Sequence, residues 1–191
     1  AASIHAQPAL DLPIQCVPNQ SCWIANLPDL DPGPAATDFT CGRMTYDKHN
    51  GTDFAVRDLS VMNAGVNVLA AAKGKVVSTR DALPDQNIRL GDKADIKDRE
   101  CGNGVLIDHG GGWATQYCHM KLGSVAVKPG TIVETGAILG QVGLSGNTEY
   151  PHLHFVVHNG NRILDPFVGI AIGENCHKGS GDRHPLWNEA T

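Results

Sequence analysis

Two short stretches of the chain, roughly a hundred residues apart, carry side chains that commonly bind metal ions. The first contains His49 and Asp53, and the second contains His152 and His154. A catalytic zinc ion is typically held by three protein ligands, mostly imidazoles and carboxylates, and keeps a fourth position for water. The two stretches supply this ligand count with one histidine to spare. The sequence therefore raises the hypothesis of a zinc hydrolase.

The spacing of His152 and His154 predicts that both side chains lie on one face of a strand. Residues 153–157 are rich in β-forming side chains, and residues i and i+2 of a strand point to the same face. Taken alone, the pair is weak evidence, because two polar residues on a solvated strand face give the same pattern.

His49 and Asp53 flank Gly51 in a turn-like segment that runs into the apolar residues 54–56, so this pair is expected where a loop enters a strand. The alternative is a turn in which Asp53 bonds its own backbone. A third candidate, His119, ends the strand-like segment 115–120. The chain has nine histidines, so one could end such a segment by chance. His119 is a candidate only because the other candidate residues occur with it.

The sequence predicts that mostly antiparallel β-structure positions these residues. The apolar segments 104–107, 132–133 and 137–139 are short, β-rich and separated by glycine-containing turns, and no long stretch has helical periodicity. Residues 108–113 indicate a hairpin tip between two strands. With 191 residues and 41% hydrophobic content, the chain is expected to form one ordinary domain with shorter flanking segments.

The polar, acidic segment 80–100 is expected to be a long loop, either a wall of a substrate groove or a solvated insertion. Asp92, Asp95 and Asp98 within it suggest a calcium loop, but the spacing and closing glutamate of an EF-hand are missing.

Three motifs in order give the chain a specific resemblance to a known family. They are HNGTDFAV (49–56), GNGVLIDHGGGWATQYCHM (102–120) and GQVGLSGNTEYPHLHFVV (140–157), supported by residues 70–77 and 127–130. They resemble the lysostaphin/LytM-type zinc metallopeptidases, peptidase family M23, over roughly residues 45–168. The resemblance implies a β-sheet catalytic domain at 45–168. Outside it, composition predicts that residues 1–44 form an irregular N-terminal arm packed against the core and that residues 169–191 form an irregular C-terminal extension.

The same resemblance implies one zinc ion held by His49, Asp53 and His154, with a water as the fourth ligand and His119 and His152 as catalytic histidines. The choice of His154 over His152 as ligand depends on the resemblance, since spacing alone does not separate them. Such a zinc ion activates water and polarises a carbonyl, and the two catalytic imidazoles would move protons and hydrogen-bond the oxyanion. Which imidazole does which is left open.

Family members are mostly peptidoglycan endopeptidases, so the expected partners are peptidoglycan peptides. Two alternatives stay open: a secreted protease acting on glycine-rich proteins, and a non-catalytic cell-wall-binding or activator module. All five positions of the implied metal and catalytic site are filled, which counts against a non-catalytic module. Before His152, most relatives carry a Ser-Thr-Gly-Pro run, where this chain has residues 147–151. Glu149 and Tyr150 are therefore expected to alter the rim of the substrate site.

Six cysteines without zinc-finger spacing indicate disulfides and an oxidising compartment. Cys101 and Cys118 fall on the two arms of the expected hairpin, so a cross-strand bridge bracing His119 is reasonable. The other four allow three pairings, of which a local bridge from Cys16 to Cys22 with Cys41 to Cys176 is mildly favoured. Reduced, buried cysteines are the alternative.

The charge and the ends of the chain indicate where the protein acts. A formal net charge of -5 gives no basic patch by count, so nucleic acid is not expected as a ligand. No stretch is long enough to span a bilayer, and no signal peptide is visible. The start at Ala1 is interpreted as a processed, periplasmic or secreted bacterial protein, although an expressed fragment would look the same.

The C-terminal region is expected to be irregular around the glycine-rich residues 178–181, with Trp187 as an anchor. His177 and His184 are expected on the surface.

Overall fold

The computed structural model describes residues 7–91, 96–176 and 184–188 and confirms mostly antiparallel β-structure. A helix of six residues, α1, and the 3-10 turn η1 accompany ten strands in this part of the chain. The elements are β1 (Cys22–Asn26), β2 (Thr52–Val56), α1 (Leu59–Ala64), β3 (Asn67–Leu69), β4 (Gly74–Arg80), η1 (Ile88–Leu90), β5 (Asn103–Gly110), β6 (Trp113–Met120), β7 (Ile132–Val133), β8 (Ile138–Gln141), β9 (His152–Asn159) and β10 (Arg162–Leu164).

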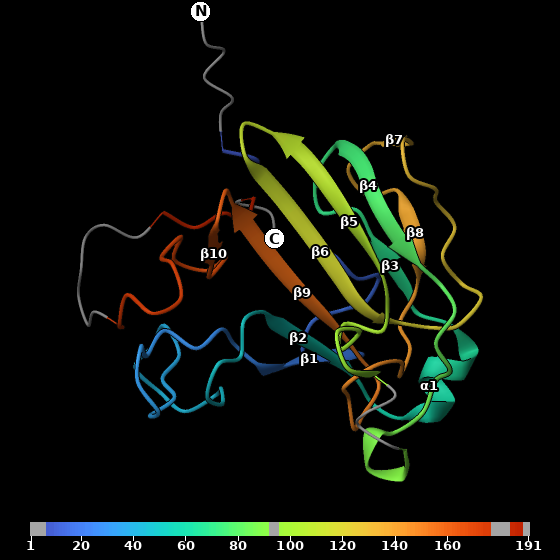
Figure 1. Ribbon diagram of the computed structural model, residues 1–191, viewed down its shortest axis with the longest axis horizontal. Helices are drawn as coiled ribbons and strands as arrows, with labels where there is room; N and C mark the ends of the chain where they lie inside the picture. Colours follow the sequence, from blue (N-terminus) through green and yellow to red (C-terminus); the bar gives the residue numbers. More distant parts are fainter. Residues whose placement is uncertain (1–6, 92–95, 177–183, 189–191) are drawn as a thin grey trace, which may run out of the picture.

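A large twisted sheet forms the body of the molecule (Figure 1). Its strands follow the order β1-β2-β9-β6-β5-β4-β7, with β10 paired to β9, and every pairing is antiparallel. A second sheet of two strands, β3 and β8, lies beside it. The central strands β5, β6 and β9 are the longest, with eight residues each. Long, paired central strands give the rigid base that a catalytic site needs.

The core lies between the large sheet and the small one. Side chains alternate along β6, so that Thr115 and Tyr117 are fully buried, and Tyr117 packs against Phe155 of β9 with ring centroids 5.4 Å apart. Val68 of β3 and Leu139 of β8 complete the same cluster. One face of the large sheet is therefore fixed by packing, and the opposite face is left to carry polar residues.

The expected hairpin is confirmed. Strands β5 and β6 pair closely, and Gly111 and Gly112 form the turn between them with φ values of 62° and 88°. These positive φ angles suit glycine, which has no Cβ to clash. The expected strands at 132–133 and 137–139 are present as β7 and β8, the latter beginning at Ile138.

The N-terminal arm packs against the core as expected, but it is not irregular throughout. Residues 22–26 form β1, which adds to the edge of the large sheet by pairing with β2. Leu10, Ile14 and Leu30 are each at most 1% exposed. Much of the arm thus belongs to the packed body of the molecule, because its apolar side chains have no other place to leave water.

At the other end, Trp187 anchors the C-terminal piece as expected. Its ring stacks on Phe155 at 5.8 Å and meets the edges of Phe54 and Phe167. His184 is exposed, as expected. His177 and the glycine-rich residues 178–181 lie outside the described residues, as do Asp92 and Asp95.

The structure contains three disulfides, which match the favoured pairing. Cys16 joins Cys22, Cys41 joins Cys176, and Cys101 joins Cys118. The first bridge closes the turn before β1. The second ties the N-terminal arm to the C-terminal extension across 135 residues of sequence. The third crosses the β5–β6 hairpin beside His119.

Candidate metal centre

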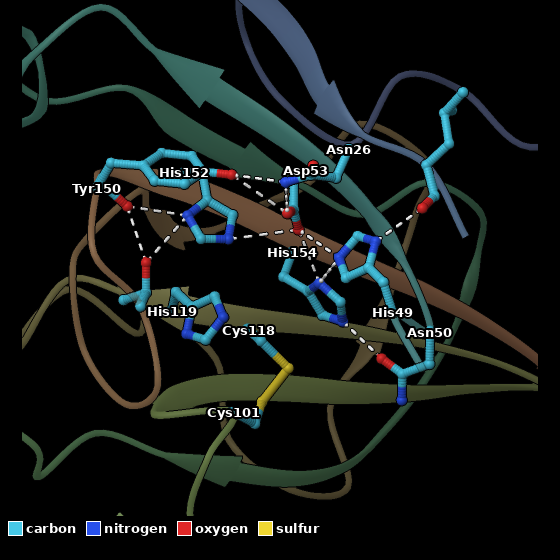
Figure 2. Close-up of polar contacts among 12 residues, drawn as sticks. Asn26, His49, Asn50, Asp53, Cys101, Cys118, His119, Tyr150, His152 and His154 are labelled. Carbon is cyan, nitrogen blue, oxygen red and sulfur yellow. Dashed lines mark hydrogen bonds and ion pairs between the residues drawn. A yellow bond between two sulfur atoms is a disulfide. The ribbon is translucent and has the colours of Figure 1, made fainter. Parts of the chain in front are cut away.

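Strand pairing brings the candidate residues together on the open face of the large sheet (Figure 2). In the β2–β9 pair, Asp53 lies opposite His154, and the residue opposite His152 is Ala55. In the β6–β9 pair, Cys118 lies opposite His154, which brings the next residue, His119, to the same place. His152 and His154 both approach Asp53, so they share a face as their spacing predicted. All five candidates therefore meet at one point of the fold.

One oxygen of Asp53 is the centre of the cluster. Its Oδ1 lies 2.8 Å from His154 Nδ1, 3.1 Å from His49 Nε2 and 3.3 Å from His152 Nε2. His49 Nε2 and His154 Nδ1 are themselves 3.2 Å apart. His49, Asp53 and His154 offer one ligand atom each within 4.8 Å of one another, and His119, His152 and His154 form a second such group.

Hydrogen bonds to the far side of two rings fix which nitrogen faces this centre. His49 Nδ1 donates to the carbonyl oxygen of Leu27 at 2.7 Å, which leaves the lone pair of Nε2 facing Asp53. His154 Nε2 lies 2.9 Å from Asn50 Oδ1, so its Nδ1 likewise presents a lone pair. Ligating histidines usually donate their other N–H in this way.

The donor set fits a zinc ion. Two nitrogen lone pairs and a carboxylate oxygen converge within 3.2 Å with no hydrogen between the two nitrogens, an arrangement that repels itself unless a cation lies among the three atoms. Two imidazoles and one carboxylate are a common ligand set of catalytic zinc. His49 and Asp53 are each only 2% exposed, which suits a site built to hold a metal rather than a solvated acidic group.

His119 and His152 point at the same centre from the other side. His119 Nδ1 donates to the carbonyl oxygen of Ser145 at 2.8 Å, and His152 Nδ1 donates to that of Tyr150 at 2.9 Å. The two rings lie 4.7 Å apart. Each ring is thus held through Nδ1 and keeps Nε2 available for proton exchange. A general acid or base needs such a fixed ring with one free nitrogen.

His119 owes its direction to an unusual backbone angle. In a regular strand it would point into the core, because Cys118 faces the open side. Instead its φ is 61°, in the left-handed region. Its N–H donates to the carbonyl oxygen of Cys101 at 2.7 Å, and the Cys101–Cys118 disulfide closes the same loop. A non-glycine residue in this region costs about 1–3 kcal/mol and persists only where its neighbours enforce it.

The electrostatics of the cluster favour an ionised Asp53 beside neutral imidazoles of His119 and His154. Burial alone would raise the pKa of Asp53, but the contacts of its carboxylate with His152, His154 and His49 outweigh burial and hold the pKa far below its usual value. Burial lowers the pKa of His119 well below its usual value, and the neighbouring histidines lower it further. Burial also lowers the pKa of His154. A neutral imidazole has the free lone pair that a ligand or a base needs.

Two adjoining cavities open along this face. The one beside the histidines has a volume of about 200 Å³ and is lined in part by Tyr46, Asn147 and Val156. The second, of about 380 Å³, extends towards Arg80 and Arg99. Glu100, Cys101 and Gln116 line both. The end of the acidic segment 80–100 therefore forms a wall of the groove. This favours the interpretation of the segment as a groove wall over that of a solvated insertion.

Several contacts of the site had no signal in the sequence. Asn26 and Leu27 reach it from the N-terminal arm, Asn50 holds His154, and Ser145 holds His119. Tyr150, which is expected at the substrate rim, also lies with its hydroxyl 3.3 Å from Asp53 Oδ2. These residues act through main-chain atoms or through pairings between distant segments, so their residue type alone does not mark them.

Comparison with known proteins places the chain among peptidases. ShyB, a peptidoglycan DD-endopeptidase of Vibrio cholerae, is 32% identical over 117 residues, which cover 61% of this chain and 22% of that protein. ShyA, a peptidoglycan DD-endopeptidase of the same organism, is 35% identical over 107 residues, covering 56% and 19%. The chain thus spans about a fifth of the length of these curated relatives.

Among solved structures, a chain of the SpoIIQ–SpoIIIAH pore-forming complex superimposes with a TM-score of 0.57 over 84% of this chain and 90% of that one. Its identity of 17% makes this a likeness of fold alone. Residues 47–166, well over half of the chain and including all five clustered residues, match the model of peptidase family M23. By this match, the chain belongs to peptidase family M23.

Proposed function

We propose that the protein is a zinc-dependent endopeptidase that hydrolyses peptide bonds of bacterial peptidoglycan. The observation that carries the proposal is the convergence of His49 Nε2, Asp53 Oδ1 and His154 Nδ1, flanked by two imidazoles held through their other nitrogen. His49, Asp53 and His154 would hold one zinc ion. When bound, zinc lowers the pKa of a coordinated water to about 7 and polarises a carbonyl group.

The remaining task is to move protons, and His119 and His152 are suited to it. Each has Nδ1 bonded to a backbone carbonyl, so proton exchange is confined to Nε2. Between them, these imidazoles accept a proton from the attacking water, hydrogen-bond the developing oxyanion and return a proton to the departing amine nitrogen. His119 is neutral at neutral pH because burial lowers its pKa well below the usual value, so its Nε2 can accept a proton.

The groove and the relatives both support a peptide as the substrate. Two adjoining cavities give an extended, partly polar channel, which suits a peptide strand better than a compact small molecule. ShyA and ShyB are named as peptidoglycan DD-endopeptidases, which supports peptidoglycan peptides as the substrate. The net charge of -5 argues against nucleic acid.

We propose that the protein works outside the cytoplasm, in the periplasm or as a secreted protein. Three disulfides are typical of an oxidising compartment. Within residues 7–91, 96–176 and 184–188, no helix is both long and apolar enough to cross a bilayer. Residues 45–168 are proposed as the catalytic unit, flanked by 1–44 and 169–191.

The test is to incubate the zinc-loaded protein with purified sacculi and, separately, with a glycine-rich protein, and to identify the released fragments by mass spectrometry. The proposal expects stem or cross-link peptides cut at an amide bond, released only with metal. Cleavage of the protein substrate alone would favour a general secreted protease. No metal-dependent cleavage of either would favour a non-catalytic module.

A further inference from the structure

The two oxygens of the Asp53 carboxylate have different surroundings. Oδ1 faces the histidines, as described above. Oδ2 faces away from them and lies 2.9 Å from Asn26 Nδ2 and 3.3 Å from the hydroxyl of Tyr150 (Figure 2). The side-chain amide of Asn26 also lies 2.9 Å from the Tyr150 hydroxyl, so the three groups form a closed triangle.

The hydrogens available in this triangle match its acceptors. The amide of Asn26 has two N–H groups and donates one to Asp53 Oδ2 and one to the Tyr150 oxygen. The hydroxyl of Tyr150 then donates its own hydrogen to Asp53 Oδ2. Both neighbours therefore occupy Oδ2, and only Oδ1 is left to bind a metal ion.

Asn26 reaches this position because of a strand that precedes the family segment. The β1–β2 register places Asn26 opposite Asp53, after an irregularity between Ile24 and Asn26 that turns the side chain inward. The next residue, Leu27, accepts the N–H of His49 through its carbonyl. Residues 26 and 27 thus support two of the three proposed ligands, although the match to peptidase family M23 begins at residue 47.

Tyr150 connects the triangle to a proposed catalytic histidine. Its ring stacks on the imidazole of His152, with centroids 4.6 Å apart and planes 28° apart. Its carbonyl oxygen also accepts the N–H of His152. A shift of this side chain would therefore disturb Asp53 and His152 together.

We propose that Asn26 and Tyr150 are positioning residues that hold Asp53 so that Oδ1 alone faces the metal, which makes zinc affinity depend on β1. The inference rests on the proposed zinc site. Removing a hydrogen bond to a metal ligand from a residue that does not itself bind the metal typically weakens metal affinity by about 10–100-fold. The two residues act on one oxygen and on each other, so their effects are coupled.

The test measures the zinc affinity of Tyr150→Phe, Asn26→Ala and the double variant by competition with a chelator. Each single change is expected to weaken zinc binding about tenfold or more. The double variant is expected to lose less than the product of the two single losses. Tyr117→Phe is the matched control, because it also removes a buried hydroxyl that hydrogen-bonds, here to Ala71 N, but on the core face. Its zinc affinity is expected to stay within twofold of the parent.

A second readout separates positioning from general loss of structure. The unfolding midpoint of the metal-free Tyr150→Phe protein is expected to stay near that of the parent, while kcat of the zinc-saturated variant falls more than KM changes. If Asn26→Ala fails to fold, Tyr150→Phe alone carries the test. A parent that binds zinc and cleaves substrate, with Tyr150→Phe equal to it within twofold in zinc affinity, would overturn this inference only. A parent that binds no zinc would overturn the proposed function as well.

Discussion

At the scale of single residues, the site depends on the backbone direction at each histidine. The strand alternation of residues 152–154 places two imidazoles on one face. The same rule would send His119 into the core, since Tyr117 is buried there and Cys118 faces the open side. Only the left-handed φ of His119 brings it to the site, and a backbone angle of this kind at a non-glycine residue has no signature in residue type.

The proposed roles divide the five residues into two groups with different expected losses. Asp53→Ala and His154→Ala are expected to lose both zinc and activity, because each removes a ligand. His119→Ala and His152→Ala are expected to keep zinc at one ion per chain and to lose about 10²–10⁴-fold in rate. Metal analysis alongside kinetics checks this division. A zinc-free His152→Ala protein would show that the assignment of ligand and catalytic roles is wrong.

At the scale of elements, the hairpin and the main strands could be predicted, whereas β1 and α1 could not. The β5–β6 hairpin has apolar alternation and a glycine turn, both local signals. Helix α1 has only six residues, too few for helical periodicity, and its end signals are limited to Asp58, which accepts the N–H of Val61, and Gly65. Strand β1 is short, and its pairing with β2 joins residues about thirty positions apart. Long-range pairing of this kind is set by packing rather than by local pattern.

The hairpin disulfide is expected to matter for rate more than for metal binding. Serine substitution of both Cys101 and Cys118 frees the loop whose carbonyl holds the backbone of His119 in its strained conformation. We expect a fall in hydrolysis rate of about 10–100-fold, because small misplacements of a catalytic group are costly. Zinc content is expected to be unchanged.

Serine substitution of Cys41 and Cys176 is the control for this prediction. It removes a disulfide that links the N-terminal arm to the C-terminal extension and does not hold His119. It is expected to lower stability and to leave the rate per folded molecule near that of the parent. Equal rates for the two double variants, each measured well below its unfolding temperature, would contradict a positioning role for the hairpin bridge.

At the scale of the whole molecule, one buried acid outside the site is expected to make stability depend on pH. Asp165 is fully buried, and its Oδ1 accepts the N–H of Phe167 at 2.7 Å. Within the described part of the chain, its Oδ2 has no hydrogen-bond partner. Burial and, to a smaller extent, the charge of Asp38 raise the pKa of Asp165 to about 7, although backbone hydrogen bonds from Phe167 and Val168 oppose the rise.

The sign of the effect follows from proton binding. Between pH 4 and pH 7, roughly, the folded chain keeps the Asp165 proton while the unfolded chain has lost it, so the free energy of unfolding falls as pH rises through this window. From pH 5 to pH 8 this contribution is on the order of 2–3 kcal/mol. Asp165→Asn keeps the acceptor for Phe167 and removes the ionisation.

Urea unfolding of the metal-free parent and of Asp165→Asn at both pH values checks this prediction. The variant is expected to be the more stable protein at pH 8 and to lose less stability between pH 5 and pH 8. Identical pH dependence of the two proteins would mean that Asp165 ionises normally in the folded chain.

The central claim is that one zinc ion, held by His49, Asp53 and His154, makes the chain a peptidoglycan endopeptidase. The most direct measurement is the rate of peptide release from purified sacculi as zinc is added back to the metal-free protein. The claim predicts no release without metal and a rise that saturates at one zinc per chain, absent from Asp53→Ala. Release that is equal with and without metal, or no release at one bound zinc per chain, would contradict it.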